Sequence, residues 1–237
     1  MRPLGPALPG AAAFKAAQRF AAQGLIDTVR DMARQQLCIF TGAANKIVLK
    51  VVVQNLNFYR SAGVPEQQIR FIDTVAAGHA LATSDREHLA CANAAPYLNN
   101  CGFMQSHDIL RTRYGDTNLP VAKLGEELLD FDQTRFAKNG YTGLSDIGHV
   151  YIPAACRAES CRVHVVFHGG TQEDSRLGNR LYTTAGYNEL ADSNRIIVLY
   201  LQIRTDRVRN PMGCRDFWGY GCKDPAARTS IRKLHHR

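Results

Sequence analysis

Short, dense apolar runs alternate along the chain with segments whose apolar positions follow a helical period. The run LCIF at 37–40 ends at Thr41-Gly42, which predicts a buried strand entering a loop. Apolar side chains recur near every 3.6 residues across 46–62, which predicts a helix. Ile69, Phe71 and their neighbours predict a second strand, followed by a loop at 76–79. This order of strand, helix and strand predicts one parallel crossover unit.

The second half of the chain repeats the same rhythm after a less regular stretch at 84–145. The pattern predicts strands at 149–152, 161–167 and 195–200, helices at 105–113 and 178–193, and a mostly helical segment at 11–35. Alternating strands and helices predict an α/β fold, with a mostly parallel sheet flanked by helices. In such folds the loops at the carboxyl ends of the strands carry the chemistry.

Composition and charge narrow the class of protein. The 237 residues are 45% hydrophobic and 21% charged, which is typical of a globular domain, and no apolar run is long enough to span a membrane. The net charge is +8. Residues 204–237 contain nine Lys/Arg and three Asp/Glu, so they supply +6 of this charge. We predict one domain over 1–222 and a basic tail over 223–237. The tail lacks interleaved aromatic residues, so no nucleic-acid partner is expected, although a tail that binds anions or nucleic acid stays an alternative hypothesis.

Cysteine usage points to an oxidising compartment. The chain has seven cysteines, and the sequence suggests two disulfide pairs among them, because Cys91 and Cys101, and Cys156 and Cys161, each flank a short polar loop. The alternative is free thiols in a reduced protein. Residues 1–19 do not form a signal peptide, because prolines and glycines interrupt their apolar positions. The cysteines are typical of a secreted or periplasmic protein, but residues 1–19 do not resemble an export signal. The cellular location therefore stays open.

Two polar residues follow the first two predicted strands. His79 lies at the end of the second strand, where an imidazole can act as a general base near neutral pH. Asn45 lies in the loop after the preceding strand, at the position of the acidic partner that orients a catalytic histidine in α/β-hydrolases. An amide can accept from the ring N–H but cannot stabilise an imidazolium by charge. The alternatives are a loop histidine that only packs and an ordinary turn asparagine.

A third motif follows the strand at 161–167. Its end, His168-Gly169-Gly170, is similar to the loop of esterases whose backbone N–H groups stabilise an oxyanion, so Gly170 and Gly169 are the expected donors. No serine stands in a G-x-S-x-G elbow, and Ser145 only approaches the pattern. No metal-ligand spacing and no nucleotide-binding glycine loop occur, so no metal or cofactor is expected.

Several blocks together resemble one protein family. These blocks are FTGAANKIV at 40–48, TVAAGHA at 74–80, VYIPAAC at 150–156, CRVHVVFHGG at 161–170, AGYNELADSNRIIVLYLQ at 185–202 and NPMGCRDFWGY at 210–220. They resemble the single-domain poly(3-hydroxybutyrate) depolymerases over about residues 7–222. The resemblance implies a circularly permuted α/β-hydrolase whose serine elbow precedes the acid, the histidine and the oxyanion strand. The chain is therefore expected to be truncated before its first residue, without the elbow.

The resemblance also assigns roles to individual residues. His79 takes the place of the catalytic histidine, Asn45 that of the aspartate, and Gly170 that of a cysteine whose N–H serves the oxyanion hole. Trp218 takes a position in the polymer-binding crevice, and His168 is predicted to contact substrate beside it. The cysteine that Gly170 replaces would bridge to Cys214. Two further departures are Leu201 where a proline is usual and Arg215 where a tryptophan is usual.

Three functional hypotheses follow. The first is a depolymerase-like carboxylic ester hydrolase that is inactive as given, so the enzyme status stays open. The second is an active esterase whose true start lies upstream, and the third is a non-catalytic module that binds polyester through the Trp218 region. The expected partner is a polyester or a short-chain ester. An absent central strand would expose a sheet edge and favour self-association.

Overall fold

The computed structural model describes residues 8–46, 49–86, 88, 90–136 and 143–215. These residues group into two compact units, which are treated separately below. Unit 1 contains the described residues up to His79, and unit 2 contains those from Ala80 onward. The predicted single domain over 1–222 stays a prediction. The predicted tail over 223–237 and Trp218 lie outside the described residues.

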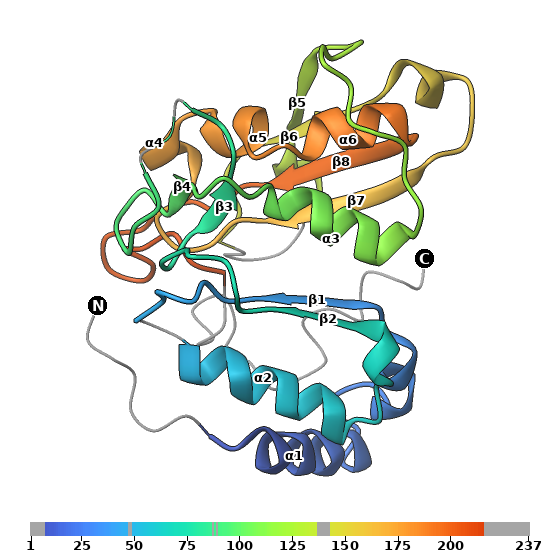
Figure 1. Ribbon diagram of the computed structural model, residues 1–237, viewed down its shortest axis with the longest axis vertical. Coiled ribbons are helices and arrows are strands. Elements are labelled where there is room, and N and C mark those ends of the chain that lie inside the picture. Colours follow the sequence, from blue (N-terminus) through green and yellow to red (C-terminus); the bar gives the residue numbers. More distant parts are fainter. Residues whose placement is uncertain (1–7, 47–48, 87, 89, 137–142, 216–237) are drawn as a thin grey trace. The chain divides into compact units, whose positions relative to one another are not determined.

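Unit 1 contains the predicted crossover of two parallel strands joined by a helix. β1 (Leu37–Phe40) and β2 (Ile69–Ile72) pair in parallel, and α2 (Leu49–Ser61) connects them (Figure 1). The helix α1 (Gly10–Ala22) packs against α2, where the Gly10 N–H donates to the Gln54 side chain. Two 3-10 turns complete the unit, η1 (Val29–Arg34) and η2 (Glu66–Gln68). The predicted strands are confirmed, and the predicted helical segment 11–35 divides into α1 and η1.

Unit 2 holds a mixed four-stranded sheet and a short two-stranded one. The four strands run in the order β5-β6-β8-β7, with β7 and β8 parallel and the β5–β6 and β6–β8 pairs antiparallel. Their bounds are β5 (Leu128–Asp132), β6 (Ile147–Tyr151), β7 (Arg162–Phe167) and β8 (Ile196–Leu201). The shorter pair is β3 (Leu81–Thr83) and β4 (Leu98–Asn100), in parallel. The fold is α/β as predicted, but the largest sheet is mixed rather than mostly parallel.

Helices cover one face of the four-stranded sheet and close the core of unit 2. They are α3 (Gln105–Tyr114), α4 (Asp174–Leu177), α5 (Arg180–Thr184) and α6 (Tyr187–Ser193), with 3-10 turns η3 (Gln133–Phe136) and η4 (Ala154–Arg157). Leu190 and Ala191 of α6 pack with Ile196, Val198 and other fully buried side chains of β8. Burying these apolar side chains supplies the main free energy that holds the helices to the sheet.

The predicted helix at 178–193 is wrong as a continuous element, because it breaks at Gly186. This glycine has φ 80°, in the left-handed region that glycine adopts most easily, and it separates α5 from α6. A Cβ on Gly186 would lie 2.4 Å from the Met104 sulfur, so the break also lets α3 approach closely. The periodicity of apolar residues does not predict such a break, because α5 and α6 both keep buried side chains.

Both predicted cysteine pairs are disulfide-bonded in unit 2. Cys91 is bonded to Cys101, and Cys156 to Cys161. In the chain-entropy account such short loops contribute about 2–3 kcal/mol each by restricting the unfolded chain. The pairs fix the loop between β3 and β4 and the turn after β6.

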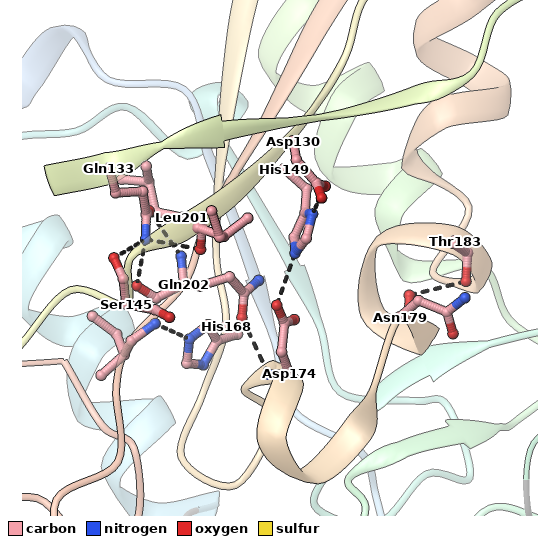
Figure 2. A network of polar contacts seen from close by, with 12 residues as sticks. Asp130, Gln133, Ser145, His149, His168, Asp174, Asn179, Thr183, Leu201 and Gln202 are labelled. Atoms are coloured by element: carbon pink, nitrogen blue, oxygen red, sulfur yellow. Dashed lines mark hydrogen bonds and ion pairs between the residues drawn. The ribbon is translucent and has the colours of Figure 1, made fainter. Parts of the chain in front are cut away.

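A buried histidine links three elements of unit 2. His149 of β6 contacts Asp130 of β5 through Nδ1 at 2.7 Å and Asp174 of α4 through Nε2 at 2.8 Å (Figure 2). Its ring also stacks on Tyr182, with centroids 3.9 Å apart. Burial by itself lowers the pKa of His149, but the hydrogen bonds and charges of the two carboxylates outweigh burial, so the pKa is raised above its ordinary value. The imidazolium is therefore the form that the fold favours.

The stability of unit 2 should therefore depend on pH through His149. Because its folded pKa is raised, the contribution is complete below the unfolded pKa of about 6.5 and disappears as the pH rises through the folded value. We expect Asp174→Asn to cost on the order of 1 kcal/mol at about pH 6 and clearly less at about pH 8.5, with part of the effect screened because Asp174 is partly exposed. Urea unfolding of both proteins at the two pH values measures this. An equal loss of unfolding free energy at both pH values would show that the ion pair of His149 with Asp174 does not contribute as described.

Candidate active site

Two strand-end loops of unit 1 are bonded to each other along their backbones. The Ala43 N–H donates to the Val75 carbonyl at 2.8 Å, and the Ala44 N–H donates to the Ala77 carbonyl at 3.0 Å. Because β1 and β2 are parallel neighbours, their carboxyl ends place the two loops side by side. The structure therefore brings together the loop that carries Asn45 and the loop that ends at His79, as the sequence predicts.

Asn45 is buried, and both its side chain and its backbone make hydrogen bonds within the loop. Its Nδ2 donates to the Thr41 hydroxyl at 3.4 Å, and its backbone N–H donates to the Gly42 carbonyl at 2.9 Å. An amide oxygen can accept from an imidazole N–H, and the role of Asn45 as a histidine partner stays a prediction.

His79 is half-buried at the end of the second loop. Burial lowers its pKa below the ordinary value for histidine, so the ring is neutral at pH 7. A neutral imidazole can accept a proton, which is the state that a general base requires. Without a carboxylate on the neighbouring loop, however, the imidazolium formed by accepting that proton would receive no charge stabilisation from Asn45.

The third predicted motif lies in unit 2, directly after β7. His168 is 5% exposed, and both of its ring nitrogens contact the backbone. Nε2 accepts from the Ile203 N–H at 3.1 Å, so the ring proton is on Nδ1, which donates to the Gly169 carbonyl at 2.7 Å. Burial lowers the pKa of His168 and keeps this neutral form. These contacts favour a role in holding the loop, while the predicted contact with substrate stays a prediction.

The two predicted oxyanion donors differ in their availability. The Gly169 N–H donates to the Gln172 side chain at 2.8 Å and is therefore occupied. The Gly170 N–H makes no hydrogen bond to any part of the chain that the structure describes. Gly170 is thus the donor that the loop offers to an external acceptor, whereas Gly169 would first have to release Gln172.

Gly170 also lies against Cys214, as its expected family position implies. A Cβ built on Gly170 would be 2.7 Å from the Cys214 sulfur. That spacing is close to the distance between the Cβ of one cysteine and the sulfur of the other in a disulfide. Burial raises the pKa of the Cys214 thiol, with a further contribution from the nearby Glu173 carboxylate.

Sequence reasoning did not identify Gln172, which fixes the shape of this loop. Its Oε1 holds the Gly169 N–H, and its Nε2 donates to the Tyr97 carbonyl at 2.7 Å. The next residue back, Thr171, has φ 63°, a strained value for a residue other than glycine. In the sequence, the only signal is a glutamine three positions after Gly169. That signal does not show a partner 75 residues away.

The described residues contain no cluster of His, Cys, Asp or Glu that could hold a metal ion. Among the helices placed by the structure, none is both long and apolar enough to cross a membrane. Trp218, predicted at the polymer-binding crevice, lies outside the described residues. The candidate residues that the structure describes are Asn45 and His79 in unit 1 and, described separately, the 168–170 loop in unit 2.

Comparison with known proteins finds relatives that share one name. No family model matches the chain. Over 222 residues it is 30% identical to the poly(3-hydroxybutyrate) depolymerase of Delftia acidovorans, covering 90% of this chain and 43% of that protein. Over 216 residues it is 28% identical to the polyhydroxybutyrate depolymerase of Talaromyces funiculosus, covering 82% and 62%. The chain thus spans less than two thirds of either relative.

Solved structures agree with these relatives. A crystal structure of PHB depolymerase from Penicillium funiculosum superimposes with a TM-score of 0.80 at 24% identity, covering 92% of this chain and 73% of that one. A serine-to-alanine variant of a PHB depolymerase, complexed with an R3HB trimer, gives 0.75 at 26% identity, covering 87% and 68%. Over most of its length the chain is similar in sequence and in structure to poly(3-hydroxybutyrate) depolymerases. Its resemblance to the depolymerases, first drawn from short sequence blocks, is confirmed.

Proposed function

We propose that this depolymerase-family chain binds a poly(3-hydroxybutyrate)-type polyester or its short-chain esters, and that the 237-residue polypeptide hydrolyses them only at background rate. The observation that carries the proposal is the Gly170 N–H. Gly170 lies three residues after the end of β7, in a loop held by contacts of His168 and Gln172, and its N–H has no hydrogen-bond partner among the described residues. Such a donor suits an ester carbonyl oxygen.

The names of the relatives and of the solved structures support the polyester as ligand, because one of those structures holds an R3HB trimer. The low rate follows from the residues of the chain. The 237 residues contain no G-x-S-x-G elbow, so no serine is placed to attack the carbonyl. Asn45 stands at the acid position, and replacing the triad aspartate of a serine protease by asparagine lowers turnover about 10⁴-fold even with the serine present.

Hydrolysis by the purified chain tests the second half of this proposal. We expect p-nitrophenyl butyrate and an R3HB trimer to be cleaved no faster by the chain than by the matched variant His79→Ala, because a base without a nucleophile to activate supplies little rate. Product is measured by absorbance for the first substrate and by liquid chromatography for the second. Turnover above background that His79→Ala abolishes would show an active hydrolase and overturn the proposal.

Binding is tested separately with pelleted, protein-free poly(3-hydroxybutyrate) particles. We expect the chain to co-sediment with the polyester and not with cellulose particles of equal surface area. Equal retention on both solids would indicate non-specific adsorption, and no retention on the polyester would refute the binding function.

A further inference from the structure

A cavity of about 230 Å³ lies within unit 2, away from the loops that carry the candidate ester site. Its wall comes from the start of α3, the junction of α5 and α6, the loop after β3 and the chain at 120–121. The α3 and α6 helices, which both contribute lining residues, pack against each other (Figure 1). We call this space the α3–α6 cavity. It is smaller than the pockets of about 300–1,000 Å³ that hold drug-sized ligands, so it suits a short ligand.

Two carboxylates line the α3–α6 cavity, Glu189 of α6 and Asp85 of the loop after β3. The Glu189 Oε2 is buried and has no hydrogen-bond partner among the described residues. None of the ion pairs that join described residues includes Glu189. Burial raises the pKa of Glu189, and the negative charge of Asp85 raises it further. A carboxylate in such surroundings gains from a cation, because burying an unpaired charge is costly.

Two other polar side chains of the wall have already used their hydrogens. The His107 Nε2 donates to the Gly186 carbonyl at 3.0 Å, and burial lowers the pKa of His107, so the ring is neutral at pH 7 and Nδ1 is an acceptor. The Thr184 hydroxyl donates its hydrogen to the Arg180 carbonyl at 2.6 Å. The exposed Ser84 hydroxyl can donate or accept. The cavity thus offers mainly acceptors, and a complementary ligand is a donor of hydrogen bonds.

The remaining wall of the α3–α6 cavity limits the ligand further. Met104, Pro120 and Val121 supply apolar surface, and no lysine or arginine is among the described residues that line the cavity. The carboxylates repel an anion. A metal ion is not the expected cation, because the described residues contain no group of three or more His, Cys, Asp or Glu that could hold one. An ammonium group on a short aliphatic chain matches both the acceptors and the apolar wall.

We propose that the α3–α6 cavity binds a small alkylammonium ion. The ammonium group lies against the Glu189 and Asp85 carboxylates and donates hydrogen bonds to them, and the aliphatic chain packs against Met104 and Val121. A free aliphatic amine and a lysine side chain share this chemistry. The inference does not rest on polyester binding, because no lining residue belongs to the loops of Asn45, His79 or Gly170.

Titration of the full chain with n-butylammonium, followed by the amide signals in nuclear magnetic resonance, tests the site. We expect saturable shifts at His107, Gly186 and Val121, and none of comparable size with n-butanol, which has a similar chain but no charge. Glu189→Gln should weaken binding about tenfold or more, since it removes a charge-assisted hydrogen bond. Asp85→Asn probes the second carboxylate independently. Glu127→Gln removes the same charge at an exposed position outside the cavity and should bind like the unaltered chain.

Each outcome of the titration decides for or against the site. Shifts without saturation, equal shifts with n-butanol, or unchanged affinity in both Glu189→Gln and Asp85→Asn would overturn the inference, provided that circular dichroism shows the variants folded. A parallel titration with Nα-acetyl-lysine N-methylamide distinguishes the two sources of the ammonium group. Binding of this derivative would include lysine side chains among the ligands, and binding of n-butylammonium alone would confine the cavity to free amines.

Discussion

Gly42→Ala should destabilise unit 1 by about 3 kcal/mol, because the added methyl group has no room. A Cβ on Gly42 would lie 2.0 Å from the Ala77 carbonyl oxygen and 2.4 Å from the Ala77 carbonyl carbon. Both are backbone atoms and cannot rotate away as a flexible side chain would. The same carbonyl accepts the Ala44 N–H that joins the two loops, so relief of the clash has to open that hydrogen bond.

The loss of stability should appear in unit 1, in the two loops that carry Asn45 and His79. Urea unfolding measures the change in free energy, and hydrogen exchange locates it. We expect faster exchange at Ala43 and Ala44 and none of this acceleration in unit 2. Gly125→Ala is the matched control, since its Cβ would meet the Asp192 carboxylate at an ordinary 3.4 Å. Unchanged stability of Gly42→Ala would mean that the loops are not packed as described.

The juxtaposition of the Asn45 and His79 loops could be predicted because it depends only on order along the chain. An apolar run, a helix and a second apolar run make a parallel pair, and parallel neighbours end at the same edge. The same reasoning placed the 168–170 loop at the end of β7. Family blocks then supplied the expected roles of Asn45 and His79, which the backbone arrangement accommodates.

Other features could not be predicted because they arise from contacts distant in sequence. The sequence places β5 in an irregular stretch, since Asp130 and Asp132 interrupt its apolar residues. Its antiparallel pairing with β6 makes the sheet mixed. The difference between the Gly169 and Gly170 N–H groups depends on a turn in which Gln172 folds back. Local sequence does not encode the direction of that side chain.

Gln133→Leu should cost about 3–5 kcal/mol, the largest effect expected of a side chain in unit 2, because it leaves several buried backbone groups without partners. Gln133 is 1% exposed and starts η3. Its Nε2 lies 2.8 Å from the Ser145 carbonyl and 3.1 Å from those of Ile147 and Gln202 (Figure 2). Its Oε1 accepts the Gln202 N–H at 3.1 Å. One amide thus joins the start of β6, the end of β8 and the loop between 143 and 146.

Leucine fills a similar volume, so the lower free energy of unfolding of this variant reflects the lost hydrogen bonds and not a cavity. Gln133→Glu sharpens the test, because a carboxylate among three carbonyl oxygens is repelled and its pKa should be raised in the folded state. Stability of this variant should therefore fall as the pH rises from about 5 to about 8, while that of Gln133→Leu should follow the unaltered chain. Gln67→Leu, at an exposed position, is the control and should change the free energy of unfolding by less than about 0.5 kcal/mol. Parallel pH profiles for the two Gln133 variants would show that the carbonyl oxygens do not converge on this side chain.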